Sequence, residues 1–132
     1  MILDSSALVA ILTGEDDYED YAQALSSSAP KWIAAPSLLE TSIVIRRERG
    51  DYGVHILRQS IAETGIQVAA FTESDAEIAT EAYRRFGKGS GHPAQLNILD
   101  TCAYALAIRL QQPLLFKGND FTRTDVPSVL VP

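Results

Sequence analysis

Residues 1–12 read MILDSSALVAIL, and this stretch decides the fold class. The apolar run at its start ends on Asp4, which is the pattern of a short buried strand that closes on a carboxylate. Asp4, Ser5 and Ser6 then favour the start of a helix, because their short polar side chains cap the free N–H groups of a first turn. The following ALVAIL continues as an apolar helix. The chain therefore opens with a strand that leads directly into a helix.

Short apolar runs and helical patterns alternate through the rest of the chain. Further strands are predicted at WIAA, IQVAAF, PLLF and SVLV. Helices are predicted over residues 36–50, 51–65 and 95–110, and another follows a capping box at residues 72–75. Strands that look buried on both faces are typical of a parallel sheet covered by helices. We therefore expect one α/β domain over residues 1–132, with a central parallel sheet flanked by helices on both faces.

Size and composition narrow the class of protein. A length of 132 residues corresponds to one ordinary domain, and the single cysteine, Cys102, excludes an internal disulfide and a cysteine-based zinc site. No apolar segment reaches the ~20 residues that a membrane helix needs. The apolar N-terminal run lacks a basic segment and contains Asp4, so we interpret it as part of the fold rather than a targeting signal. We expect a cytoplasmic protein with no membrane partner.

The net charge of −6 argues at first against a nucleic-acid partner. Residues 1–40 contain seven acids and one lysine, whereas residues 41–132 contain ten acids and ten bases. The excess lies mainly in the run from Glu15 to Asp20, which we interpret as the solvated face of a helix. The net charge is therefore a local feature and does not exclude binding to RNA.

Two acids in the first part of the chain occupy unusual positions. Asp4 stands at the carboxyl end of a predicted strand, the edge of an open α/β sheet at which ligands bind, although helix capping alone also explains it. Glu40 shares a helix face with Ile43 and Val44, which we expect to point inward. Exposure beside Arg47 is the alternative for Glu40.

Two more acids follow in the second part of the chain. Asp100 lies inside an otherwise apolar predicted helix, where an unpaired carboxylate would neutralise or destabilise the fold. The nearest arginine in the same helix, Arg109, falls on its far side. Asp120 follows the predicted strand PLLF and, taken alone, is an ordinary turn residue.

Because strand ends and the first turns of the following helices converge at one edge of a parallel sheet, all four acids are expected to meet there. Clustered carboxylates require a hard divalent cation such as Mg²⁺ or Mn²⁺, the arrangement of metal-assisted phosphoryl transfer.

Four segments together resemble the VapC toxins of the PIN-domain ribonucleases: MILDSSALVAIL, LLETSIVI, YRRFGKGSGHPAQLNILDTCAYALA and PLLFKGNDF. The resemblance covers nearly the whole chain, in order and with the expected spacing. It implies an acidic pocket that binds one or two Mg²⁺ or Mn²⁺ ions and hydrolyses RNA, leaving 5′-phosphate and 3′-hydroxyl ends. It also implies a cognate VapB antitoxin that holds the toxin inactive, and a homodimer.

The resemblance assigns the four catalytic acids of the family to Asp4, Glu40, Asp100 and Asp120. It makes Asp4 and Asp100 the chief metal ligands and the other two further ligands, either directly or through water. Ser6 matches the small hydroxyl residue that often supports the first acid. Family members often have glycine before the third acid, whereas this chain has Leu99, which is expected to alter how the substrate approaches.

Basic residues around a glycine-rich loop at residues 87–94, together with a lysine beside Asp120, are candidates for holding RNA phosphates. These candidates are Arg84, Arg85, Lys88, His92 and Lys117. For the arginines a solvated helix end is the alternative, and His92 has no neighbouring histidine or cysteine with which to share a metal.

Three other functions have to be compared with this hypothesis. A receiver domain would need a second acid beside Asp4 and an aspartate at the end of the central strand, but the chain has Ser5 and Phe71 at those places. A haloacid-dehalogenase-type phosphatase would need an aspartate where Ser6 stands. A PIN fold that has lost catalysis and only binds a partner is disfavoured because all four acids are present.

Overall fold

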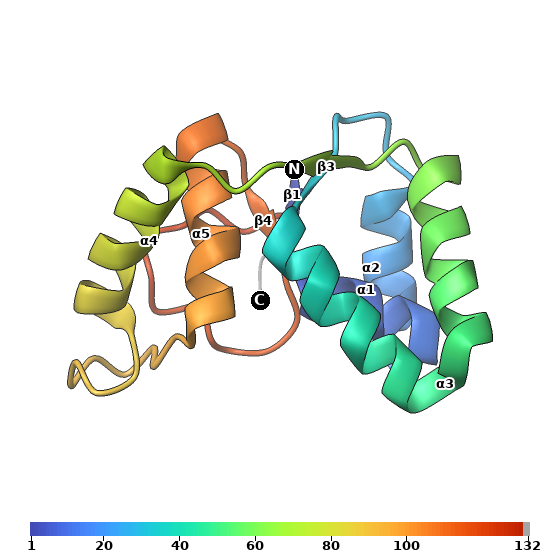
Figure 1. Ribbon diagram of the computed structural model, residues 1–132, viewed down its shortest axis with the longest axis horizontal. Coiled ribbons are helices and arrows are strands. Elements are labelled where there is room, and N and C mark those ends of the chain that lie inside the picture. The colour runs from blue at the N-terminus through green and yellow to red at the C-terminus, as the bar shows by residue number, and fades with distance from the viewer. Residues whose placement is uncertain (131–132) are drawn as a thin grey trace.

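Four short strands form an all-parallel sheet in the computed structural model, which describes residues 1–130 (Figure 1). They are β1 (Ile2–Leu3), β2 (Trp32–Ala34), β3 (Gln67–Ala69) and β4 (Leu114–Leu115), in the order β3-β2-β1-β4. The central strand β1 pairs Ile2 with both Trp32 and Leu114. This confirms the parallel sheet that the apolar runs predict.

Helices cover both faces of the sheet, as predicted. On one side lie α1 (Ser5–Thr13), α2 (Tyr18–Leu25) and α3 (Ala35–Glu63), and on the other lie α4 (Glu73–Phe86) and α5 (Ile98–Leu110) (Figure 1). Each side has its own cluster of buried apolar side chains, with the sheet between them. Among the described residues, no helix has the length and apolar character needed to cross a bilayer.

The two helices predicted on either side of residue 50 form one bent element, α3. Gly50 adopts φ 70° and ψ −168°, a left-handed conformation that breaks the helix and that glycine adopts without strain. Gly53 lies in the next turn, where a Cβ atom would stand 2.4 Å from Cβ of Arg49. The bend therefore depends on glycine at two positions.

The structure corrects two of the predicted strands. Strand β3 is not buried on both faces: Gln67 and Val68 are exposed, because β3 is an edge strand that pairs only with β2. The run SVLV does not form a strand over the residues that are described. Ser128 alone makes an isolated parallel bridge with Leu114, and Val131 lies outside the described residues.

The carboxyl edge of the sheet is where the chain turns from strand to helix. Strand β1 passes through Asp4 into α1, and β2 passes directly from Ala34 into α3. Helix α5 begins at the same end, after the glycine-rich loop (Figure 1). Its first residue is Ile98, so the helix starts three residues later than predicted. The N-terminal turns of three helices thus open onto one edge.

Candidate active site

Asp4 is buried between the end of β1 and the first turn of α1. Its side chain is 4% exposed and caps α1: Oδ2 accepts hydrogen bonds from the backbone N–H of Ser6 at 3.0 Å and from the Ser6 hydroxyl at 2.5 Å. The capping alternative for Asp4 therefore holds, and the same geometry fixes the carboxyl group at the carboxyl edge of the sheet.

Ser6 joins Asp4 to the segment that follows β4. Its Oγ donates to Asp4 and accepts a hydrogen bond from the backbone N–H of Lys117 at 2.9 Å. Lys117 precedes the loop that carries Asp120, so one hydroxyl connects two segments that bear predicted catalytic acids. The contact agrees with the supporting role assigned to Ser6.

Glu40 reaches the same edge from the second turn of α3. Its Oε1 accepts a hydrogen bond from the Ser5 hydroxyl, and its side chain is half-buried. The prediction that Ile43 points inward is wrong, since this side chain is 57% exposed. The buried face of α3 is instead the row that contains Thr41 and Ile45.

Asp100 lies in the first turn of α5, not in the helix interior as predicted. Asn97 is the N-cap: its side chain accepts from the backbone N–H of Asp100 at 2.8 Å, and its own N–H donates to Asp100 Oδ2 at 2.9 Å. Asp100 as a whole residue is 8% exposed, and its Oδ1 receives no hydrogen bond from residues 1–130. Arg109 does not compensate it, as expected, because that guanidinium pairs with Asp75.

Burial and neighbouring carboxylates act on the two buried acids in the same direction. Burial raises the pKa of Asp100 to about 7 against the N–H bond from Asn97, and the charges of Asp4, Asp120 and Glu40 add to the rise. Burial likewise raises the pKa of Asp4, to which Glu40 contributes, despite the hydrogen bonds from Ser6. Asp4, Glu40 and Asp120 therefore each lie within electrostatic range of Asp100, and Asp120 is exposed.

The chemistry of this group fits a hard divalent cation. All four donors are carboxylates, and within residues 1–130 none of them pairs with a lysine, arginine or histidine. The described part of the chain does not hold three or more such side chains in a ready-made metal-binding arrangement. Hydroxyl and backbone contacts hold Asp4, Glu40 and Asp100 instead.

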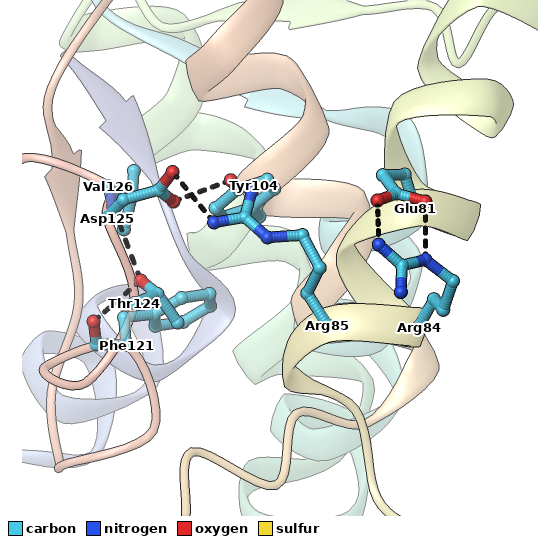
Figure 2. Close-up of polar contacts among 8 residues, drawn as sticks. All are labelled: Glu81, Arg84, Arg85, Tyr104, Phe121, Thr124, Asp125 and Val126. Atoms are coloured by element: carbon cyan, nitrogen blue, oxygen red, sulfur yellow. Dashed lines mark hydrogen bonds and ion pairs between the residues drawn. The ribbon is translucent and has the colours of Figure 1, made fainter. Parts of the chain in front are cut away.

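Both arginines that are predicted to bind RNA form ion pairs (Figure 2). Arg84 binds Glu81 through two hydrogen bonds of 2.9 and 2.5 Å. Arg85 reaches Asp125 at 3.4 Å, and the Tyr104 hydroxyl donates to the same carboxylate at 2.6 Å. The C-terminal segment therefore contacts α4 through Arg85 and α5 through Tyr104.

The other three candidates differ in how free they are. The ammonium group of Lys117 pairs with Glu15 and with Asp17, the latter at 2.7 Å, so this part of the acidic run is not simply solvated as predicted. His92 accepts a hydrogen bond at Nδ1 from the backbone of the same loop. Lys88 is exposed and forms no ion pair with the described residues.

The sequence analysis did not identify Ser5 and Asn97 as site residues. Ser5 holds Glu40 across a separation of 35 residues, which no local pattern indicates. Asn97 can be predicted as a helix cap, because Asn-x-x-Asp has the same spacing as the capping box of Thr72 and Asp75.

Comparisons with known proteins agree with this architecture. The sequence matches the PIN domain family over residues 1–127. It is 45% identical over 130 residues to ribonuclease VapC28 of Mycobacterium tuberculosis, covering 98% of each chain, and 43% identical over 127 residues to ribonuclease VapC42 of the same species, covering 96% of each.

Solved structures with the same fold include a toxin and a toxin–antitoxin complex. The structure of VapC20 of Mycobacterium tuberculosis, a sarcin-ricin-loop-cleaving toxin, aligns over 97% of both chains with a TM-score of 0.80 and 18% identity. VapBC2 from Rickettsia felis, bound to a promoter DNA fragment, aligns over 96% of this chain and 94% of its own with a TM-score of 0.74 and 14% identity. A toxin–antitoxin complex from Klebsiella pneumoniae aligns over 94% of this chain and 92% of its own, with a TM-score of 0.69 and 14% identity. The chain belongs to the PIN domain family and, within it, to the VapC ribonucleases.

Proposed function

We propose that this VapC ribonuclease is a divalent-metal-dependent endoribonuclease and the toxin of a toxin–antitoxin pair. The observation that carries the proposal is the lack of a basic partner for any of the four acids in residues 1–130, although two of them are buried. Buried carboxylates without a counter-charge are costly, and a cation supplies that charge.

In this proposal Asp4 and Asp100 are the chief ligands for Mg²⁺ or Mn²⁺, and Glu40 and Asp120 are further ligands, directly or through water. Held by these residues, an ion would supply a lower pKa for a water molecule and stabilisation of negative charge on the phosphate and the leaving oxygen. Ser6 and Asn97 fix the orientation of the two chief ligands through hydrogen bonds. These hydrogen bonds restrain the two carboxyl groups, although the acids of the described residues are not gathered in a ready-made metal-binding arrangement.

The substrate in this proposal is RNA, and the names of the related ribonucleases support it. The inhibitor is a cognate VapB antitoxin, which the toxin–antitoxin complexes among the structures of the same fold support. A homodimer in the cytoplasm stays a prediction. Because the chain belongs to the PIN family, it is neither a receiver domain nor a haloacid-dehalogenase-type phosphatase. An experiment has to distinguish the ribonuclease from a PIN fold that has lost catalysis.

The experiment incubates the purified chain with a cellular RNA pool in Mg²⁺, in Mn²⁺ and in EDTA. We expect cleavage with either ion and none with EDTA or with Asp100→Asn. Asp16→Asn is the matched control, because it removes an exposed acid that lies outside the site. Cleavage that persists both in EDTA and in Asp100→Asn would contradict the metal mechanism, and a wild-type chain that never cleaves would support the binding module.

A further inference from the structure

Lys88 differs from the other lysine and arginine candidates for binding RNA phosphates. Arg84, Arg85 and Lys117 each pair with carboxylates, whereas Lys88 has no such partner among residues 1–130. Its backbone is held in place, since its N–H donates to Leu96 O at 2.9 Å. An exposed lysine whose charge has no partner is suited to bind a phosphate group.

Beside Lys88 the surface is hollowed between the end of α4 and the start of α5. The hollow has a volume of about 340 Å³ and is lined by Tyr83, Lys88, Asn97, Ile98 and Leu99. It combines one aromatic ring, two aliphatic side chains, one amide and one cation. Proteins bind unpaired RNA bases with this combination, stacking the base on an aromatic ring and contacting its backbone with a cation.

The ring of Tyr83 is exposed on one side and fixed on the other. It is 36% exposed, so part of its surface is open to a ligand. It packs on Gly87, where a Cβ atom would come within 2.7 Å of the ring and 2.4 Å of the Tyr83 carbonyl oxygen. Glycine at position 87 thus allows the ring to lie where it does, and little conformational freedom would be lost when a base stacks on it.

The hollow adjoins the first turn of α5, which carries Asp100. Asn97 lines the hollow and binds Asp100 at both ends of the capping box. Leu99 also lines it and directly precedes Asp100 in the sequence. A nucleotide seated in the hollow would therefore lie next to the turn that carries Asp100.

We propose that Tyr83, Lys88 and Leu99 form a subsite for one unpaired base of the RNA, next to the phosphate that is cut. The inference rests on the proposed ribonuclease activity and adds a substrate feature to it. Tyr83 stacks on the base, Lys88 binds the adjoining phosphate, and Leu99 forms a wall that limits which base fits.

The experiment sequences the cut ends of a cellular RNA pool and measures kinetics on one cleaved RNA taken from that pool. We expect Tyr83→Ala and Lys88→Ala to lower kcat/KM by about tenfold, mainly through KM, because each removes a binding contact. Tyr83→Phe keeps the ring and should therefore lower kcat/KM much less than Tyr83→Ala does. Leu99→Ala should broaden the base preference beside the cut without abolishing cleavage. Tyr52→Ala and Arg58→Ala are the controls, since they remove an exposed tyrosine and an exposed arginine from α3, in the other helical layer.

The outcomes separate this inference from the proposed function. If the wild-type chain cleaves and all the subsite variants cut the same bonds with unchanged kinetics, the subsite is wrong while the ribonuclease activity stands. If the variants lose binding of a VapB-type antitoxin but not RNA cleavage, the hollow is a protein interface and the inference is likewise overturned. If the wild-type chain does not cleave at all, the proposed function itself fails.

Discussion

The first turns of α4 and α5 carry the same local design but opposite electrostatics. Each begins with a capping box in which an aspartate at the third helical position binds the N-cap backbone: Asp75 with Thr72, and Asp100 with Asn97. Both carboxyl groups are buried, at 1% and 8% exposure. Asp75 binds Arg109 through two hydrogen bonds of 2.5 and 3.1 Å, whereas Asp100 faces other carboxylates.

The partner sets the direction of each pKa shift. Burial alone would raise the pKa of Asp75, but the hydrogen bonds from Arg109 and Thr72 outweigh it and hold that pKa below its ordinary value. Burial raises the pKa of Asp100 to about 7, and no cation within residues 1–130 pairs with this carboxyl group to oppose the rise. Capping and burial are therefore features of the fold, and the missing counter-charge is what marks Asp100 as part of a site.

We expect the largest effect when each of the two aspartates is replaced and the rates of RNA cleavage are compared. Asp100→Asn keeps an oxygen that can accept from Asn97 but removes the charge, so cleavage should fall by at least about a hundredfold. Asp75→Asn, assayed well below its unfolding temperature, should cleave RNA at close to the wild-type rate. Initial rates on one RNA measure both. Equal losses of cleavage rate in the two variants would contradict the conclusion that Asp100 belongs to the site and Asp75 does not.

Removing Arg109 tests whether this arginine stabilises the buried charge of Asp75. Arg109→Met leaves Asp75 buried without a cation, and at pH 7 it should lower the free energy of unfolding by about 3 kcal/mol. Urea unfolding measures the change. Arg46→Met serves as control, since it breaks an exposed pair with Asp51 that should contribute less than about 1 kcal/mol. A loss from Arg109→Met no larger than the control would mean that Asp75 does not depend on its partner.

A smaller effect is expected at the hydroxyl that supports Asp4. Ser6→Ala removes the hydrogen bonds to Asp4 and from Lys117, so kcat should fall by about tenfold while the fold is retained. Ser6→Thr keeps a hydroxyl and should restore part of the rate. Steady-state kinetics and circular dichroism of both variants provide the test, and full activity of Ser6→Ala would remove Ser6 from the site.

The smallest expected effect is the pH dependence of the Asp75 contribution. Its folded pKa is lowered, so the ion pair stabilises the fold fully above the unfolded pKa of about 3.9 and is lost as pH falls through the folded value. The difference in unfolding free energy between wild type and Asp75→Asn should stay constant from about pH 7 to 5 and shrink by about pH 3. Urea titrations at these pH values measure it. A difference that grows on acidification would have the wrong sign.

The strand–helix alternation could be predicted from the sequence because it depends on local patterns. Local patterns also make the four acids candidates, and their catalytic role stays a prediction. Apolar runs predict strands but not their place in the sheet, so the exposure of Val68 on the edge strand could not be foreseen. The pairing of Lys117 with Asp17 joins residues 100 apart, and that of Arg109 with Asp75 joins residues 34 apart. The apolar run around Asp100 predicts a helix interior, whereas the Asn97 cap places Asp100 in the first turn.

Binding of Mn²⁺ to the purified chain, measured by titration calorimetry without RNA, tests the central claim most directly. We expect wild type and Asp75→Asn to bind one or two ions and Asp100→Asn to bind at least about tenfold more weakly. Unchanged Mn²⁺ binding by Asp100→Asn, or no binding by the wild-type chain, would contradict a cation site built on Asp100.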